Sequence, residues 1–123
     1  MELSSQSPIT LYVVAVPIGH IDDFSIRAKN ILSSLQFIFC EDRRQTQELF
    51  KRAQINFHGK MICLNEHKED KADIWFDRFK KSGNDVAFVS DAGTPAISDP
   101  GAVVVQLAHK KGINVVPLPG PSA

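Results

Sequence analysis

The sequence is poor in the features that mark secreted, membrane and strongly charged proteins. Its 123 residues include two cysteines, and 14 basic residues balance 14 acidic ones, so the formal net charge is zero. A neutral chain has no overall electrostatic attraction to nucleic acids or membranes. No apolar run reaches the roughly 18 residues of a membrane-spanning helix, and residues 1–7 lack the basic and apolar regions of a secretory signal. We therefore expect a cytoplasmic protein that does not enter a membrane.

Several common site signatures are also missing. Cys40 and Cys63 each lie in a short apolar run, and disulfides are rare in chains without an export signal, so we expect two buried, reduced thiols. The four histidines are scattered without metal-ligand spacing, so we expect no metal site. The sequence contains no Gly-x-Gly-x-x-Gly fingerprint, no phosphate-binding loop ending in Gly-Lys-Ser/Thr and no Gly-x-Ser-x-Gly elbow.

What the sequence does contain is a regular alternation of strand-like and helix-like segments. Short apolar runs predict five strands, at residues 11–16, 37–40, 61–64, 86–89 and 113–116. Apolar residues at helical spacing predict four helices between them, near residues 28–35, 44–53, 72–82 and 101–111. Continuously apolar strands joined by helices are typical of a parallel sheet covered on both faces. We therefore predict one α/β domain over residues 11–123 with a five-stranded, mainly parallel sheet, preceded by a loose arm over residues 1–10.

Residues that favour helix starts and stops support these limits. Asp23 and Ser25 are alternative N-caps for the first helix, because either side chain can accept a hydrogen bond from a free N–H of the first turn. Asp99 is a suitable N-cap for the fourth helix, and Pro100 a suitable first helical residue. Gly83 and Gly112 follow the third and fourth helices, where glycine commonly ends a helix.

Polar, Gly and Pro residues gather after the predicted strands. The groups include Pro17-Ile18-Gly19, Glu41 to Arg44, Asn65-Glu66-His67, Asp91 to Gly101, and 117–123. The carboxyl ends of parallel strands lie at one edge of the sheet, where α/β proteins bind ligands. Each group also has a structural interpretation as a turn, a helix start or a structural histidine. Their concentration after the strands favours a ligand site, although the spacing alone does not identify the ligand.

At these same positions the chain resembles a known family. Five segments match its motifs in order: Val14-Ala15-Val16-Pro17-Ile18-Gly19, Glu41-Asp42-x-Arg44-x-Thr46, Asn65-Glu66-His67, Ser90-Asp91-Ala92-Gly93-Thr94-Pro95-x-Ile97-Ser98-Asp99-Pro100-Gly101, and Pro117-x-Pro119-Gly120-Pro121-Ser122-Ala123. They are similar to the small-subunit ribosomal RNA cytidine-2′-O-methyltransferases, which belong to the tetrapyrrole methylase-like superfamily. The resemblance runs from about residue 11 to residue 123, and the block over residues 90–101 is its most specific part.

The resemblance implies a function and a site. It implies S-adenosylmethionine as the methyl donor, held between two α/β domains of which this chain matches the N-terminal one. It implies a donor cleft lined by residues from three loops: Pro17, Ile18, Gly19, Gly93, Thr94, Pro95, Ile97, Ser122 and Ala123. It implies a cytidine ribose of small-subunit ribosomal RNA as the substrate, with five residues on the RNA side: Asp42, Arg44, Glu66, His67 and Asp91. It also implies a homodimer.

The chemistry implied is an in-line displacement in which a ribose 2′-hydroxyl attacks the sulfonium methyl group. The leaving group is neutral, so no metal is required, but a base must accept the hydroxyl proton. The candidates are His67, then Asp91, then Glu66. Arg44 and Arg43 are expected to donate charge-assisted hydrogen bonds to RNA phosphates.

Besides a single-domain nucleotide-binding or receiver-like module, which the missing phosphate-binding loop disfavours, two alternatives stay open at this point. One is a methyltransferase of the same superfamily that acts on a tetrapyrrole (a precorrin or uroporphyrinogen), although those enzymes share a Gly-Asp-Pro core that differs from the segment beginning at Asp91. The other is an inactive fragment or binding module of the same fold. A domain without its partner is expected to be inactive alone and to self-associate through exposed apolar surface.

Overall fold

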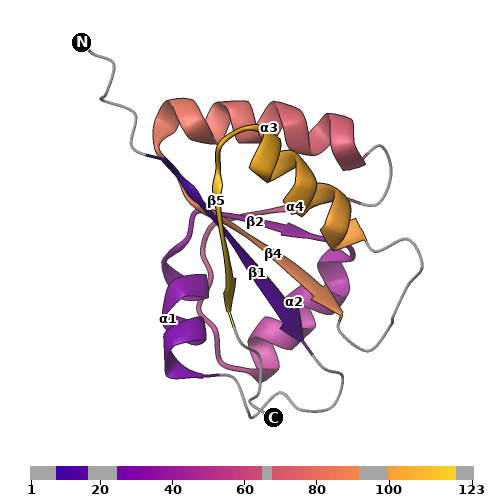
Figure 1. Ribbon diagram of the computed structural model, residues 1–123. Coiled ribbons are helices and arrows are strands. Elements are labelled where there is room, and N and C mark those ends of the chain that lie inside the picture. Colours follow the sequence, from indigo (N-terminus) through magenta and orange to yellow (C-terminus); the bar gives the residue numbers. More distant parts are fainter. Residues whose placement is uncertain (1–7, 17–24, 65–67, 92–99, 119–123) are drawn as a thin grey trace.

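The computed structural model describes residues 8–16, 25–64, 68–91 and 100–118, in which five strands alternate with four helices (Figure 1). The elements in chain order are β1 (Thr10–Val16), α1 (Ile26–Ser34), β2 (Phe37–Cys40), α2 (Arg43–Arg52), β3 (Lys60–Cys63), α3 (Lys68–Ser82), β4 (Val86–Asp91), α4 (Pro100–Lys110) and β5 (Asn114–Leu118). Every predicted strand and helix is present, so the predicted α/β class is confirmed.

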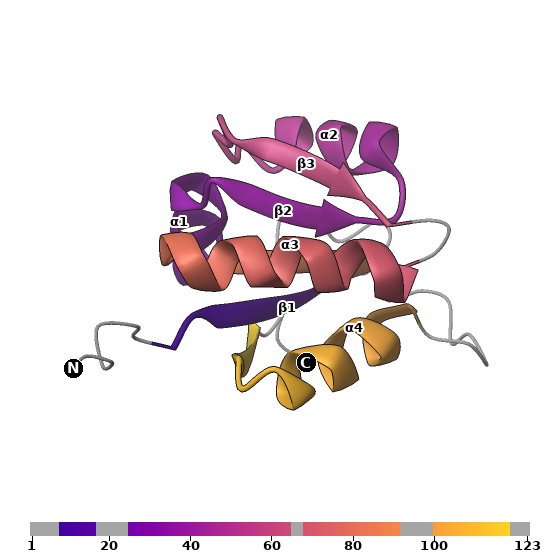
Figure 2. The ribbon, with the colours of Figure 1, turned by 90° about the horizontal axis from the view of Figure 1, so that it is seen from above.

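The strands form one sheet in the order β3-β2-β4-β1-β5, and each neighbouring pair is parallel. The steps from β1 to β2 and from β2 to β3 move toward one edge, whereas the steps from β3 to β4 and from β4 to β5 move toward the other. Because crossovers are right-handed, these two directions place their helices on opposite faces. Figures 1 and 2 show this arrangement, with α1 and α2 on one face and α3 and α4 on the other.

The core under α3 and α4 is rich in aromatic rings. Phe39 from β2 meets Phe76 edge to face, with ring centroids 5.5 Å apart, and lies 5.9 Å from Phe79. All three rings are almost completely buried, together with Leu11 of β1 and Phe88 of β4. Full burial of one such side chain contributes roughly 1.5–3 kcal/mol, so this face accounts for much of the hydrophobic stabilisation.

The core under α1 and α2 is mainly aliphatic. Val14 and Ile38 from the sheet pack with Leu32 of α1, Phe50 of α2 and Ile55 in the segment that follows it. Central strands are therefore buried on both faces, and this explains why their sequences read as continuous apolar runs instead of alternating ones.

Helix ends follow the predicted signals where they are described. Ser25 is the N-cap of α1, since its Oγ accepts a hydrogen bond from the backbone N–H of Ala28 at 3.0 Å. Pro100 begins α4, and Gly83 and Gly112 follow α3 and α4 with φ of 76° and 74°. The proposed caps Asp23 and Asp99 lie outside the described residues.

Two boundaries differ from the prediction. Helix α3 begins at residue 68, four residues before its apolar stripe. Its first residues are polar, and Glu69, Asp70 and Lys71 are exposed, so this turn gives no apolar signal. The folded region also begins before residue 11. Ile9 is buried, its carbonyl accepts a hydrogen bond from Asn114 N–H at 3.0 Å, and Thr10 N–H donates to Asp85 Oδ1 at 2.8 Å. Residues 9 and 10, which the prediction assigned to the arm, are thus part of the folded domain.

Candidate functional site

The carboxyl ends of the strands meet at one edge of the sheet. In the strand register, Val16 at the end of β1 is level with Asp91 at the end of β4, and Cys40 at the end of β2 is level with Cys63 at the end of β3. Figure 1 shows the arrowheads of β1 and β4 side by side. The polar segments noted in the sequence come directly after these strand ends. The structure therefore places the strand ends that precede them at one edge of the sheet, as predicted.

The edge is divided at the neighbouring strands β1 and β4. Helix α1, the next element after β1, lies on one face of the sheet, and α4, the next element after β4, lies on the other (Figures 1 and 2). This reversal makes the pair β1–β4 a topological switch point, the position at which open α/β sheets bind their ligands. The first two donor-binding segments in the predicted set are the ones that depart from this point.

The predicted donor and base residues fall almost entirely outside the described part of the chain. Those that do are Pro17, Ile18, Gly19, Glu66, His67, Gly93, Thr94, Pro95, Ile97, Ser122 and Ala123. Asp91 is the exception, because its backbone ends β4 and pairs in register with Val16. Of the three candidate bases, it alone is therefore placed, at the switch point itself.

The corner between β2 and α2 contains three of the residues predicted to face or bind RNA: Asp42, Arg43 and Arg44. Asp42 is the N-cap of α2, and its Oδ1 accepts a hydrogen bond from Gln45 N–H at 3.1 Å. Arg43 and Arg44 are exposed in the first turn, and the Arg43 guanidinium donates a hydrogen bond to the carbonyl of Met61 at 3.3 Å. Cations are unfavourable near a helix N-terminus, so helix stability does not explain two arginines at this position.

Beneath this corner lies a small buried group that reasoning from sequence did not identify. Thr46 is buried and its hydroxyl donates to the Asp42 carbonyl at 2.9 Å. Burial raises the pKa of the Cys40 thiol, although a hydrogen bond with the Thr46 side chain acts in the opposite direction. A thiol with a raised pKa stays protonated and unreactive at neutral pH. Thr46 belongs to one of the quoted motifs, and its contacts here indicate a structural role.

Both cysteines are free thiols, as predicted, but only one is fully buried. Cys40 is buried, whereas Cys63 is half-buried and its Sγ donates to the carbonyl of Glu41 at 3.0 Å. The difference arises because β3 is an edge strand, paired on one side only. Among the residues that the structure describes, no group of His, Cys, Asp and Glu is placed to hold a metal ion, and no helix is long and apolar enough to cross a membrane.

A cleft of about 490 Å³ lies between α2 and β3. Its lining residues come from α2, from β3 and from the segment between them: Arg43, Gln47, Phe50, Lys51, Ile55, Phe57, Gly59, Lys60 and Met61. Sequence reasoning missed this cleft, because its three cations are scattered over 18 positions of the sequence. The spacing of residues 43, 47 and 51 at i, i+4 and i+8 is the one signal that they share a helix face.

Comparison with known proteins gives consistent results. Residues 10–123 match the family model of tetrapyrrole (corrin/porphyrin) methylases. Relatives named "Ribosomal RNA small subunit methyltransferase I" include proteins from Hydrogenobaculum sp. (46% identity over 114 residues, 92% of this chain and 49% of the relative) and Borrelia garinii subsp. bavariensis (44% over 113 residues, 92% and 50%). The relative from Escherichia coli O157:H7 is 41% identical over 114 residues, which are 92% of this chain and 39% of the relative.

The chain therefore spans about half, or less, of the length of the curated relatives it matches. Among solved structures, it is similar to uroporphyrin-III-C-methyltransferase from Thermus thermophilus, with a TM-score of 0.63 and 15% identity, over 92% of this chain and 48% of that one. At this identity the likeness concerns the fold alone. It agrees with the parallel sheet and the arrangement of helices described above.

Proposed function

Because this chain belongs to the tetrapyrrole (corrin/porphyrin) methylase family, we propose that it is the N-terminal domain of an S-adenosylmethionine-dependent methyltransferase of small-subunit ribosomal RNA. The observation that supports the RNA substrate is the identity of 41–46% to relatives named for that substrate, over 92% of the chain. The relatives are about twice as long or longer, so in this proposal a second domain completes the active site.

The donor site in this proposal lies at the switch point between β1 and β4. Pro17, Ile18 and Gly19 follow β1, and Gly93, Thr94, Pro95 and Ile97 follow β4, so both segments start from neighbouring strand ends. Ser122 and Ala123 follow β5, which pairs with the other side of β1. This topology suits a donor held across the edge of the sheet. When bound, S-adenosylmethionine supplies an electrophilic methyl group on its sulfonium.

The acceptor in this proposal is a cytidine 2′-hydroxyl, and His67, Asp91 or Glu66 accepts its proton. The position of the Asp91 backbone at the end of β4 supports a carboxylate close to the donor segments. Holding hydroxyl and methyl group in line supplies a large part of such an acceleration, up to about 7–11 kcal/mol. The exposed Arg43 and Arg44 orient the RNA through its phosphates. The proposed location is the cytoplasm.

The surface of the described residues is compatible with further assembly. Ile26 is 78% exposed and begins α1 at the carboxyl edge, where the second domain would lie in this proposal. Ile74 on α3 and Val103 on α4 are also exposed apolar side chains. We therefore expect the isolated chain to be inactive and to self-associate, as a homodimer or larger species. A single monomeric mass at all concentrations in analytical ultracentrifugation would contradict the self-association.

Two measurements test the proposed function. The first is isothermal titration of S-adenosylhomocysteine into the purified chain. Micromolar binding would mean that this domain carries a substantial part of the donor site, whereas no binding would mean that the site needs the second domain. The second replaces the matching residues of the Hydrogenobaculum relative with this chain, and then incubates the chimera with radiolabelled donor and purified small ribosomal subunits. We expect label in the RNA, recovered as 2′-O-methylcytidine. Transfer to uroporphyrinogen but not to subunits would overturn the RNA substrate in favour of a tetrapyrrole.

A further inference from the structure

The cleft between α2 and β3 has a charge that the whole chain lacks. Arg43, Lys51 and Lys60 line it, and none of the described residues in its lining is acidic. The formal net charge of the chain is zero, so this local excess of three cations is not a reflection of composition. All three residues are exposed. A concave surface lined by one sign of charge raises the local concentration of ligands of the opposite charge, so the cleft selects for anions.

The floor of the cleft is apolar and partly aromatic. Phe50 is buried, and its ring meets the half-buried Phe57 edge to face at 6.0 Å. Ile55 and Met61 complete the apolar lining. A groove that combines cations with an accessible aromatic ring is typical of surfaces that bind single-stranded nucleic acid. Phe57 is the accessible ring here, because Phe50 is only 3% exposed.

The cations are spread along the cleft and are not gathered at one point. Arg43 and Lys51 are the first residue and the last-but-one residue of α2, and a rise of about 1.5 Å per residue separates them by about 12 Å. Lys60 begins β3 on the other wall. Arg43 also belongs to the β2–α2 corner, so the cleft starts at the carboxyl edge and runs away from it. An elongated polyanion matches this distribution better than a single phosphate does.

The outer edge of β3 is less suited to binding an added peptide strand than the cleft is to binding a nucleic acid. Lys60 N–H and Leu64 N–H bond to β2, so the intervening Met61 and Cys63 direct their backbone groups away from the sheet. Their carbonyls already accept hydrogen bonds, from Arg43 at 3.3 Å and from the Lys71 ammonium at 3.0 Å. An added strand would have to displace both cations, whereas a phosphate can use the remaining N–H groups of the Arg43 guanidinium.

We propose that the α2–β3 cleft binds the phosphate backbone of a single-stranded segment of the substrate RNA, beyond the nucleotide that is methylated. This inference rests on the proposed function for the identity of the RNA, but its geometry is independent of the donor site. Lys51 and Lys60 contact the phosphates, and Arg43 links the cleft to the site at the carboxyl edge.

The test uses the purified chain and a fluorescein-labelled oligouridylate, whose binding is followed by anisotropy between 50 and 200 mM salt. This probe contains no cytidine, so it reports on phosphate contacts and not on recognition of the methylated nucleotide. The variant is Lys51→Gln/Lys60→Gln. Loss of two contacts to a single strand should reduce the slope of log K against log salt by about 1.4, and the affinity by about tenfold.

The matched control is Lys81→Gln/Lys110→Gln, which removes the same charge from exposed positions on α3 and α4. We expect it to change neither slope nor affinity by more than twofold, and both variants should retain the wild-type circular dichroism spectrum and melting temperature. Equal losses in the two variants, or no loss in the cleft variant, would overturn the proposal. Equal displacement of the RNA by polyglutamate would overturn it as well.

The experiments distinguish an error in the cleft proposal from an error in the proposed function. If oligouridylate binding does not depend on the cleft lysines while the chimera still methylates subunits, only the cleft is wrong. If the chimera transfers no label to RNA while cleft-dependent binding persists, the cleft binds RNA and the proposed reaction is wrong.

Discussion

On the α3–α4 side of the sheet, Phe76 and Phe79 interlock with Phe39, whereas on the α1–α2 side Leu32 and Phe50 cover smaller aliphatic side chains. The first pair of helices is long and its members pack against each other. The second pair is shorter, and α2 leaves a cleft against β3. The comparison suggests that one face mainly stabilises the domain, while the other is available for a ligand.

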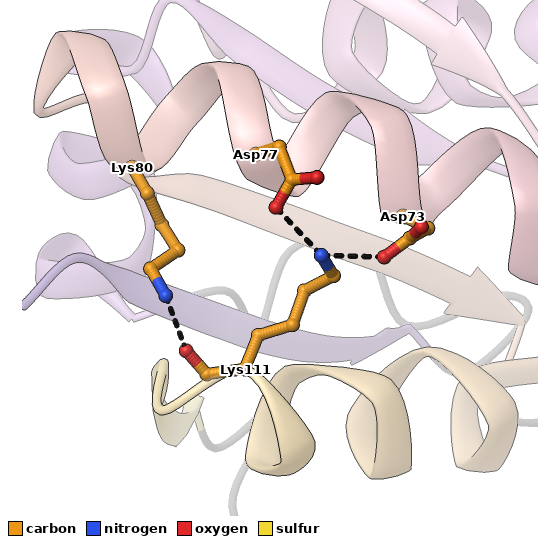
Figure 3. Close-up of polar contacts among 4 residues, drawn as sticks. All are labelled: Asp73, Asp77, Lys80 and Lys111. Atoms are coloured by element: carbon orange, nitrogen blue, oxygen red, sulfur yellow. Dashed lines mark hydrogen bonds and ion pairs between the residues drawn. The ribbon is translucent and has the colours of Figure 1, made fainter.

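Charged residues are used differently on the two faces. Between α3 and α4, the Lys111 ammonium lies 2.5 Å from Asp73 and 2.6 Å from Asp77, and the Lys80 ammonium donates to the Lys111 carbonyl at 2.6 Å (Figure 3). Both carboxylates come from α3, so this network ties α3 to the C-terminal end of α4. At the cleft, by contrast, none of the described residues that line it with Arg43, Lys51 and Lys60 carries a carboxylate. A chain with equal numbers of basic and acidic residues can therefore still have a local excess of positive charge, as it does at the cleft.

The largest expected effect is on the aromatic core. Phe76→Ala should lower the free energy of unfolding by about 3–5 kcal/mol, because it removes a fully buried ring and leaves a cavity. Phe50→Ala should cost less, although Phe50 is also buried, because that ring borders the cleft and water can reach the space that its removal leaves. Urea unfolding of both variants measures the difference. An equal or larger loss for Phe50→Ala would break the comparison between the faces.

The next effect concerns Gly59, where the chain approaches β2 closely. A Cβ at this position would lie 2.2 Å from the backbone oxygen of Gln36, so Gly59→Ala should cost about 1–3 kcal/mol through a forced backbone shift. Gly83→Ala is a useful control, because open space surrounds that position and its cost of about 1–2 kcal/mol comes from its positive φ alone. Only Gly59→Ala should also weaken oligouridylate binding, because only Gly59 lines the cleft. Unchanged stability in Gly59→Ala would contradict the close approach.

A smaller effect is expected for the Lys111 network. Lys111→Met should lower stability by about 0.5–1 kcal/mol at neutral pH and low salt, because the ion pairs are partly exposed and screened. The exposed neighbour Lys110→Met is the matched control and should have no comparable effect.

The pH dependence of that effect has a defined sign. Hydrogen bonds to Asp73 and Asp77 raise the pKa of Lys111 above 10.5, so its contribution is complete below that pH and is lost as the pH rises through the folded-state value. The hydrogen bond from Lys111 lowers the pKa of Asp77 below 3.8, so its contribution is present above that pH and is lost as the pH falls. The difference between wild type and Lys111→Met should therefore shrink at both extremes. A constant difference from pH 3 to pH 11 would contradict the network.

The smallest expected effect is a difference in reactivity between the two thiols, which does not require any change in stability. Cys63 should react with a thiol reagent such as 5,5′-dithiobis(2-nitrobenzoate) in the native protein well before Cys40, because Cys40 is buried and burial raises its thiol pKa. Cys40→Ser and Cys63→Ser assign the two kinetic phases. A single fast phase from both thiols would show that the β2–α2 corner opens readily.

Much of the fold was predictable because it is encoded locally. The run Val86-Ala87-Phe88-Val89 indicates a buried strand, and the spacing of Ala72, Phe76 and Phe79 indicates a helix, whatever their partners. The polar first turn of α3 and the buried Ile9 were not predicted, because the local sequence does not encode them. Neither has a periodic apolar pattern, and each is positioned by tertiary contacts.

For the site, the sequence located the polar groups after the strands but not their neighbours. The order of Pro17 before Asp42 and Asp91 in the chain does not say that β1 lies beside β4 and two strands away from β2. The cleft cations were likewise unremarkable in the sequence, because Lys60 is 17 positions from Arg43 and the two line one cleft only once β3 packs beside α2.

By itself, the sequence determined the kinds and order of the elements and the residues that follow each strand, since these depend on side-chain periodicity and on turn and cap preferences within a few residues. The tertiary structure alone decided the strand order β3-β2-β4-β1-β5, the switch point between β1 and β4, and the cationic cleft. Those features depend on which distant segments pair and on which face each crossover runs, and the burial of apolar surface across the whole sheet selects among these arrangements.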